Sequence, residues 1–240
     1  KVKPPSEYGL EGHCLNGIYL SWTNTAEDLE KHTKKAGKQP SFMFMPYRGT
    51  RVTFELHDSF IEEMKRVSDI GTAPFITYKF SRLIKGKGSW SWNRQVWKDF
   101  HHGKYDKTIA KSASKLAAYG YNRLQEDKLA GFFIWTFREM NLSAPAWNGE
   151  SGNIKKAWER MHRIFQEEGA NQFATWVVNP YAYIYNVGNW KSYVPDPELY
   201  DWLALNTYKV DFDGGSPEEL LRKDMNIAKK YHKPLMIAEI

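Results

Sequence analysis

Two glutamates stand at matching places in this chain, 100 residues apart. Glu139 closes the apolar run that begins at Gly131, and Glu239 closes the run that begins at Pro234. A carboxylate at the end of an apolar strand is costly to bury unless it has partners or a chemical role. Two carboxylates can divide the cleavage of a glycosidic bond, one as proton donor and one on the opposite side. The two form a candidate catalytic pair, whereas either glutamate alone is as readily explained as a salt-bridged strand end.

Strand-like and helix-like segments alternate along the chain and would position these carboxylates. Predicted strands span residues 17–22, 41–47, 72–80, 129–139, 172–178, 200–208 and 233–239. Predicted helices span residues 25–36, 58–68, 105–119, 154–168 and 216–231, with a short helical piece in the tryptophan-rich stretch 84–103. This alternation predicts a parallel α/β sheet, and so many repeats in one domain favour a (β/α)8 TIM barrel. The carboxyl ends of barrel strands meet on one face, where the active site lies.

The number of strands sets an expectation about the extent of the domain. A closed barrel of this type needs eight strands, and the sequence supplies seven before it stops at Ile240. We therefore expect residues 1–240 to form a single catalytic barrel domain that is C-terminally incomplete, with the eighth β/α unit missing.

Two helix starts are specified by local side chains. Thr25 is followed three residues later by Asp28, and Ser216 is followed by Pro217 and then by Glu219. In such capping boxes the two side chains satisfy backbone N–H groups at the start of the helix, and proline suits the first helical position. Both patterns predict a helix that begins directly after the capping residue.

Bulk composition narrows the class of protein. The chain is 42% hydrophobic and 26% charged, and it has no apolar run long enough to cross a membrane. Its net charge of +6 is spread along the chain, which favours solvated faces over a nucleic-acid surface. Cys14 is the only cysteine, so no internal disulfide can form. We expect a monomeric, secreted protein whose signal peptide, absent from this chain, has been removed.

The candidate motifs for binding a metal or a phosphate are each incomplete. The run 211–215 hints at a calcium loop, but its twelfth position is Arg222 where a glutamate is needed. The histidines lack the HExxH spacing. The segment 86–88 lacks the third glycine and the Lys-Ser/Thr ending of a phosphate-binding loop. We expect no metal and no cofactor.

Aromatic residues are abundant, with 10 Trp, 14 Tyr and 13 Phe. Most should fill the core. Trp and Tyr also suit the binding of sugar rings, because one end of the side chain is apolar and the other can hydrogen-bond. Trp147 and Trp176 are the tryptophans that we expect to contact a sugar, with a core or rim position as the alternative.

From about Gly103 onward the chain resembles glycoside hydrolase family 26, a barrel family of β-mannanases and related endo-β-glycanases. The resemblance rests on short motifs in the family order over roughly 140 residues, whereas the first 100 residues match only in their strand–helix rhythm. The motifs are Gly103-Lys104-Tyr105-Asp106, Glu139-Met140-Asn141 with Trp147, Gly152-Asn153, Ala157-Trp158, Gly169-Ala170-Asn171, the segment 190–208, and Lys233-Pro234 to Glu239.

The resemblance implies a role for each matching residue. Glu139 would be the general acid/base and Glu239 the nucleophile of a retaining reaction. Tyr208 would hydrogen-bond the nucleophile, while Asn141 and Trp147 would contact the substrate.

Arg138 is the main departure from the family, which usually has histidine before the acid/base. An arginine close to a carboxyl lowers the pKa of that carboxyl, which does not suit an acid that must be protonated near neutrality. We therefore expect Arg138 to point away, or to bind a substrate oxygen or the nucleophile. Leu142 replaces the family glycine, and the first tryptophan of the family falls near Ala144, so the substrate need not be mannan.

Three hypotheses follow. The leading one is a retaining endo-β-glycanase that cleaves β-mannan or a related polysaccharide, with β-1,3-xylan, mixed-linkage β-glucan and microbial exopolysaccharide left open. The second is a non-catalytic carbohydrate-binding barrel, which Arg138 favours and the two carboxylates oppose. The third is a barrel lyase or aldolase with a lysine Schiff base. It is disfavoured because Lys79 is the nearest lysine to a strand tip and lacks an apolar approach.

Overall fold

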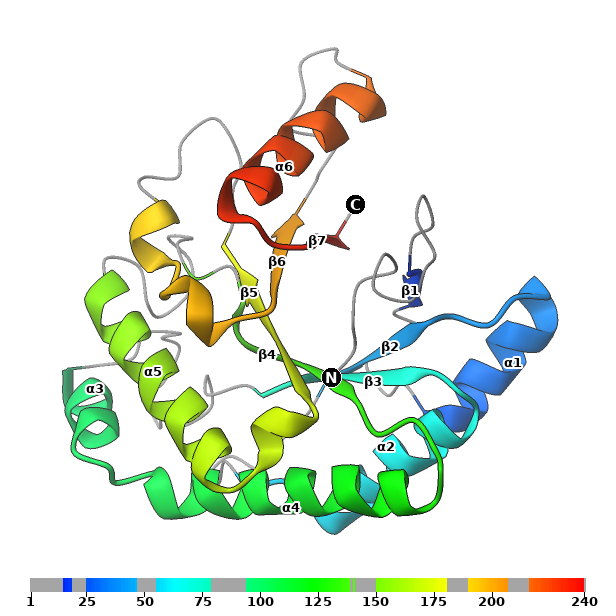
Figure 1. The fold of residues 1–240 in the computed structure, drawn as a ribbon, viewed down its shortest axis with the longest axis horizontal. Helices are drawn as coiled ribbons and strands as arrows, with labels where there is room; N and C mark the ends of the chain where they lie inside the picture. The colour runs from blue at the N-terminus through cyan, green and yellow to red at the C-terminus, as the bar shows by residue number, and fades with distance from the viewer. Residues whose placement is uncertain are drawn as a thin grey trace, which may run out of the picture.

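Seven parallel strands lie side by side in chain order and form one curved sheet (Figure 1). The computed structural model describes residues 15–18, 25–46, 55–78, 94–138, 140, 150–180, 190–206 and 216–239. The strands are β1 (Gly17–Ile18), β2 (Phe42–Pro46), β3 (Ala73–Thr77), β4 (Phe132–Arg138), β5 (Ala174–Asn179), β6 (Trp202–Asn206) and β7 (Leu235–Glu239). The expected parallel α/β sheet is confirmed, while its closure into a TIM barrel by an eighth strand stays a prediction.

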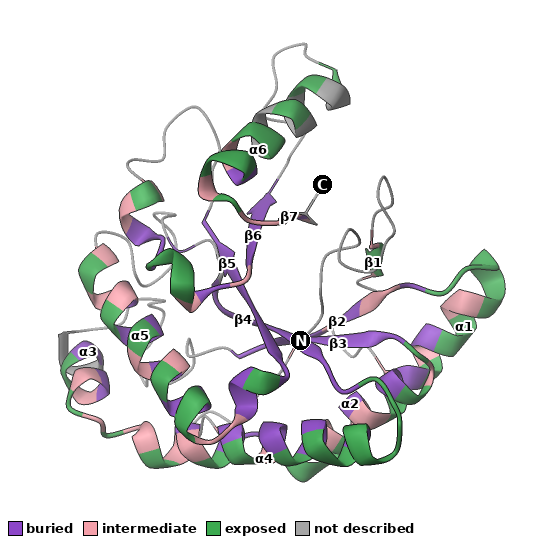
Figure 2. Cartoon of the chain, viewed as in Figure 1, coloured by how far each residue is buried: buried purple, intermediate pink, exposed green. Residues whose placement is uncertain are grey.

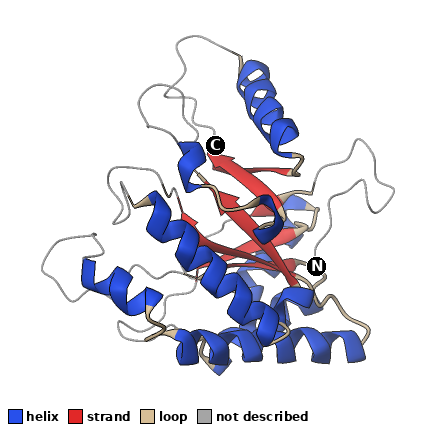
Figure 3. Cartoon of the chain, turned by 60° about the vertical axis from the view of Figure 1, so that its left-hand side comes forward, coloured by secondary structure: helices blue, strands red, loops and turns tan. Residues whose placement is uncertain are grey.

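Helices cover the outer, convex face of this sheet (Figures 1 and 3). They are α1 (Ala26–Ala36), α2 (Asp58–Asp69), α3 (Arg94–His101), α4 (Asp106–Gln125), α5 (Ser151–Glu167) and α6 (Pro217–Tyr231), with short 3-10 turns η2 (Ala170–Gln172), η3 (Trp190–Tyr193) and η4 (Pro197–Leu199). None of the helices in these described segments is both long and apolar enough to span a membrane.

Both predicted capping boxes are present. The Thr25 side chain accepts from the backbone N–H of Asp28, and the Asp28 carboxylate accepts from the Thr25 N–H. Ser216 and Glu219 form the same reciprocal pair at the start of α6. Helix α4 is longer than expected and continues past residue 119. Arg123, which is buried in this added turn, forms one ion pair with Asp69 of α2 and another with Glu126, three residues further along the chain.

The core has two layers, one on each face of the sheet, and the central strands β3, β5 and β6 between them are wholly buried (Figure 2). The outer layer joins alternate strand residues, such as Ile76 and Ile134, to the helices. The inner layer contains residues from the strands and the segment before β1, and no helix residue. Its buried members are Ala73, Phe75, Phe133, Trp135, Val177, Trp202, Ala204 and Met236. Aromatic rings dominate this concave layer, with Phe75 stacked on Trp135 at 5.7 Å between centroids.

Candidate active site

Polar residues close the carboxyl ends of four neighbouring strands. Arg138 ends β4, Asn179 ends β5, Asn206 ends β6 and Glu239 ends β7. Arg138 pairs in register with Asn179, and Asn206 pairs in register with Glu239. Because all strands are parallel, these residues come to the same end of the sheet, directly above the aromatic inner layer.

The ladders beside β4 and β7 are irregular just before these polar ends. On β4, Trp135 pairs with Val177 and Arg138 pairs with Asn179. The chain therefore advances three residues along β4 while it advances two along β5. On β7, Ile237 pairs with Leu205 and Glu239 pairs with Asn206. The chain therefore advances two residues along β7 while it advances one along β6. One extra residue in a strand is a β-bulge, which reverses the alternation of faces beyond it and recurs beside active sites. The sheet therefore carries one bulge before each candidate catalytic position.

Asn179 is buried on the concave side of β5. Val177 belongs to the inner layer and Val178 to the outer layer, so Asn179 continues the inner row. Pro180 follows and has no backbone N–H with which to extend the ladder. The Asn179 side-chain amide instead donates to the carbonyl of Ala204 at 3.0 Å, which carries the β5–β6 contact one step further.

The same amide nitrogen also contacts Asn206. Asn179 Nδ2 lies 3.0 Å from Asn206 Oδ1, and both side chains are buried, with exposed fractions of 0% and 4%. Buried amides must find partners, because an unsatisfied polar group costs about 1–3 kcal/mol. The two asparagines thus lock together the ends of β5 and β6.

Thr77 adds a third polar group to this end of the sheet. It ends β3 and is only 2% exposed, and its hydroxyl has no hydrogen-bond partner in the structure as described. It follows Phe75 by two positions, which places it in the inner row. Thr77, Asn179 and Asn206 therefore form a polar layer over an apolar floor.

The sequence-predicted site residues fall into three groups. Glu139, Asn141, Trp147 and Tyr208 lie outside the described residues. Arg138 and Glu239 are placed by their backbone, at the ends of β4 and β7. Trp176 is described in full.

Trp176 is a core residue, which corrects the expectation that it contacts a sugar. Its side chain is 0% exposed and belongs to the outer layer. The ring packs against Trp158 and Phe165 of α5, at 5.5 and 5.1 Å between centroids. Its indole N–H donates to Asn171 Oδ1 at 2.8 Å. No surface of the ring is left for a ligand.

Asn179 and Asn206 are the residues that sequence reasoning missed. Each is the first polar residue after an apolar strand, in Val177-Val178-Asn179 and in Leu205-Asn206. The same signal singled out the glutamates, so it could have found both asparagines. Among the residues that the structure describes, no group of three or more His, Cys, Asp or Glu side chains could hold a metal ion.

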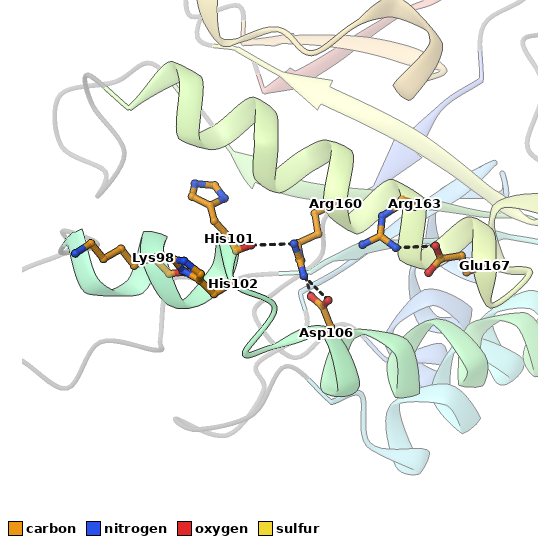
Figure 4. A network of polar contacts seen from close by, with 7 residues as sticks. All are labelled: Lys98, His101, His102, Asp106, Arg160, Arg163 and Glu167. Atoms are coloured by element: carbon orange, nitrogen blue, oxygen red, sulfur yellow. Dashed lines mark hydrogen bonds and ion pairs between the residues drawn. The ribbon is translucent and has the colours of Figure 1, made fainter.

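A polar network on the helical side explains the Gly103–Asp106 motif (Figure 4). Arg160 of α5 forms a fork on Asp106, the first residue of α4, with N–O distances of 2.6 and 2.5 Å. Its remaining terminal nitrogen donates to the carbonyl of His101 at 3.0 Å. Gly103 has φ +80 and lies so close that a Cβ would be 2.4 Å from Arg160 Nη2. The motif therefore joins α3, α4 and α5.

No protein-family model matches the sequence, and no curated protein matches it.

Solved structures with the same fold are found, and several are glycoside hydrolases of family 26. GH26A from Muricauda sp. MAR_2010_75 has a TM-score of 0.68 and 17% identity, over 93% of this chain and 76% of that one. The Bacillus subtilis mannanase BCman has a TM-score of 0.64 and 14% identity, over 92% and 67%. The β-mannanase BoMan26A from Bacteroides ovatus has a TM-score of 0.58 and 14% identity, over 82% and 61%. The chain thus shares the fold of these family 26 enzymes.

Proposed function

We propose that the protein is a retaining glycoside hydrolase that cleaves internal β-glycosidic bonds of a polysaccharide. The observation that carries the proposal is the pair of bulged strand ends, β4 directly before Glu139 and β7 at Glu239, in a fold shared with family 26 enzymes. Both ends lie on the side of the sheet where barrel enzymes carry their active sites.

The proposed reaction is a double displacement. Glu239 attacks the anomeric carbon while Glu139 donates a proton to the leaving oxygen. Water, deprotonated by Glu139, then releases the glycosyl group from Glu239 with retained configuration. The two steps require a carboxyl separation of about 5–5.5 Å. Asn141, Trp147 and Tyr208 are proposed to hold the sugar and the nucleophile, and Arg138 to bind a substrate oxygen or the nucleophile.

The proposed substrate is a β-mannan, since BCman and BoMan26A, which share this fold, are mannanases and the sequence motifs resemble glycoside hydrolase family 26. We propose no cofactor, a monomer and an extracellular place of action. We further propose that the seven strands correspond to seven of the eight strands of a TIM barrel, because the described residues of β1 and β7 lie at the two edges of the sheet and do not pair with each other.

The test is hydrolysis of a polysaccharide panel by the wild type and by Glu139→Ala and Glu239→Ala. The panel contains β-1,4-mannan, β-1,3-xylan, mixed-linkage β-glucan and an exopolysaccharide. Losing an acid/base or a nucleophile should lower kcat by a factor on the order of 10² or more. Glu159→Ala, at an exposed residue of α5, is the matched control and should stay active.

Three results would contradict the proposal. The first is activity that survives Glu239→Ala. The second is inversion of the first-formed anomer in a proton NMR time course. The third is a wild type that binds a glycan of the panel and cleaves none, which would instead support a carbohydrate-binding barrel.

A further inference from the structure

The orientation of the Asn206 amide is fixed by chemistry. Asn179 contacts a backbone carbonyl, that of Ala204, and a carbonyl can only accept. The contacting atom of Asn179 must therefore be its NH2 nitrogen. That nitrogen has a second hydrogen and lies 3.0 Å from Asn206, so the atom it meets there must be the Asn206 oxygen.

This arrangement turns the other end of the Asn206 amide away from β5. An amide carries its oxygen and its NH2 group on opposite sides of one carbon. With the oxygen held toward Asn179, the NH2 group points away from Asn179. Glu239 lies on β7, the strand on the other side of β6, and stands in register with Asn206. The bulge in β7 sets this register.

We propose that Asn206 is a positioning residue for the reaction, and that its amide NH2, aimed by Asn179, donates to the carboxylate of Glu239. This inference rests on the proposed function, because it assigns a positioning residue to the same active site. A donor that favours the ionised form of a carboxylate keeps it available as a nucleophile. A fixed partner also holds its oxygen at the angle of attack.

Charged groups near this point come from the neighbouring strands. Arg138 ends β4, Glu239 ends β7 and Glu139 follows β4, whereas β3, β5 and β6 end in neutral side chains. Replacing the Asn206 amide with a carboxylate would place a second negative charge beside Glu239.

The experiment compares Asn206→Asp, Asn206→Ala and Asn179→Ala with the wild type, on mannan and on an aryl β-mannoside. We expect each variant to lower kcat by about 10- to 100-fold, since a displacement near 1 Å can cost that much, with KM changed by less than about threefold. Asn206→Asp should also move the acidic limb of the kcat profile to higher pH. Asn206→Ala adds no buried charge. It therefore provides the test of the proposal if the Asn206→Asp variant does not fold.

Asn171→Ala is the matched control. Asn171 is a buried asparagine with two partners, Trp176 and the carbonyl of His162, but it lies at the amino end of β5. It should lower the melting temperature and leave kcat and the pH profile unchanged.

Two outcomes separate the possible failures. If Glu239→Ala is inactive while both Asn206 variants keep the wild-type kcat and pH profile, the positioning role is wrong and the proposed function stands. If Glu239→Ala keeps activity, or the wild type cleaves nothing on the panel, both proposals fall.

Discussion

Asp106 and Arg160 form a two-pronged ion pair that joins the first residue of α4 to the middle of α5. The contact raises the pKa of Arg160, mainly through the hydrogen bond from its guanidinium to Asp106. Charge-assisted forks are stronger than neutral hydrogen bonds, although the pair is a quarter to a third exposed and partly screened. We expect Arg160→Lys to lower the free energy of unfolding by about 1 kcal/mol, because lysine cannot reproduce the fork.

Arg163 supplies the control on the same helix. It pairs with Glu167 at 2.6 Å, but both side chains are more than half exposed. Exposed pairs of this spacing contribute about 0.3–0.5 kcal/mol. Arg163→Lys should therefore change urea unfolding by less than Arg160→Lys, and equal effects would contradict the structural role of the fork.

Gly103 is predicted to tolerate a side chain poorly. Its φ of +80 disfavours any L-residue, and a Cβ would also meet Arg160 Nη2 at 2.4 Å. We expect Gly103→Ala to cost about 2 kcal/mol or more in urea unfolding. Gly37→Ala tests the φ penalty alone, since Gly37 has φ +66 with nothing within 4 Å. It should cost about 1 kcal/mol, and a cost as large as that of Gly103→Ala would argue against the clash.

Gly120 sits inside α4 because of Phe173. A Cβ there would lie 2.2 Å from the ring, which packs directly on the helix backbone. Alanine gains up to about 1 kcal/mol of helix propensity, but overpacking costs about 1–3 kcal/mol. We expect Gly120→Ala to lower the melting temperature. Gly152→Ala, with open space in the first turn of α5, should raise it, and a rise in both would contradict this account.

Local chemistry made much of the fold predictable. The capping boxes at Thr25 and Ser216 involve residues three apart, and their geometry is set by the chain itself. Strand and helix order followed from apolar runs and amphipathic periodicity in the same way. The end of α4 was harder, because Arg123 is held by Asp69 of α2 and by Glu126. The ion pair with Asp69 exists only after the helices pack.

The end of the sheet at which the candidate site lies was predictable from the sequence, whereas the residues that form the site were harder to predict. Glu239 was found because a carboxylate after an apolar run is conspicuous. The bulges at the ends of β4 and β7 are differences in register between two strands, which one sequence does not contain. Trp176 was misassigned because β5 is buried on both faces. Without alternation between polar and apolar residues, no pattern tells which side chain faces the helices.

Trp176→Phe tests this corrected position. The substitution removes the hydrogen bond to Asn171 and leaves a small cavity beside α5. We expect a loss of about 2–3 kcal/mol in the free energy of unfolding, with KM for a polysaccharide unchanged. A raised KM at unchanged stability would return Trp176 to the sugar-binding residues.

Alkaline pH is predicted to destabilise the protein through two buried tyrosines. Burial raises the pKa of Tyr119 to about 12, and burial likewise raises the pKa of Tyr200 to about 12. In the unfolded chain both phenols ionise near their ordinary pKa of 10. Their contribution to stability is therefore complete below pH 10 and is lost as the pH rises toward 12, by roughly 2 kcal/mol for each phenol. Tyr119→Phe cannot ionise, so the variant should keep more of its neutral-pH stability at pH 11 than the wild type.

Tyr121→Phe, at a half-exposed tyrosine of the same helix, serves as the control. The measurement is the urea midpoint at pH 8 and pH 11, and an equal drop in the wild type and in Tyr119→Phe would contradict the linkage.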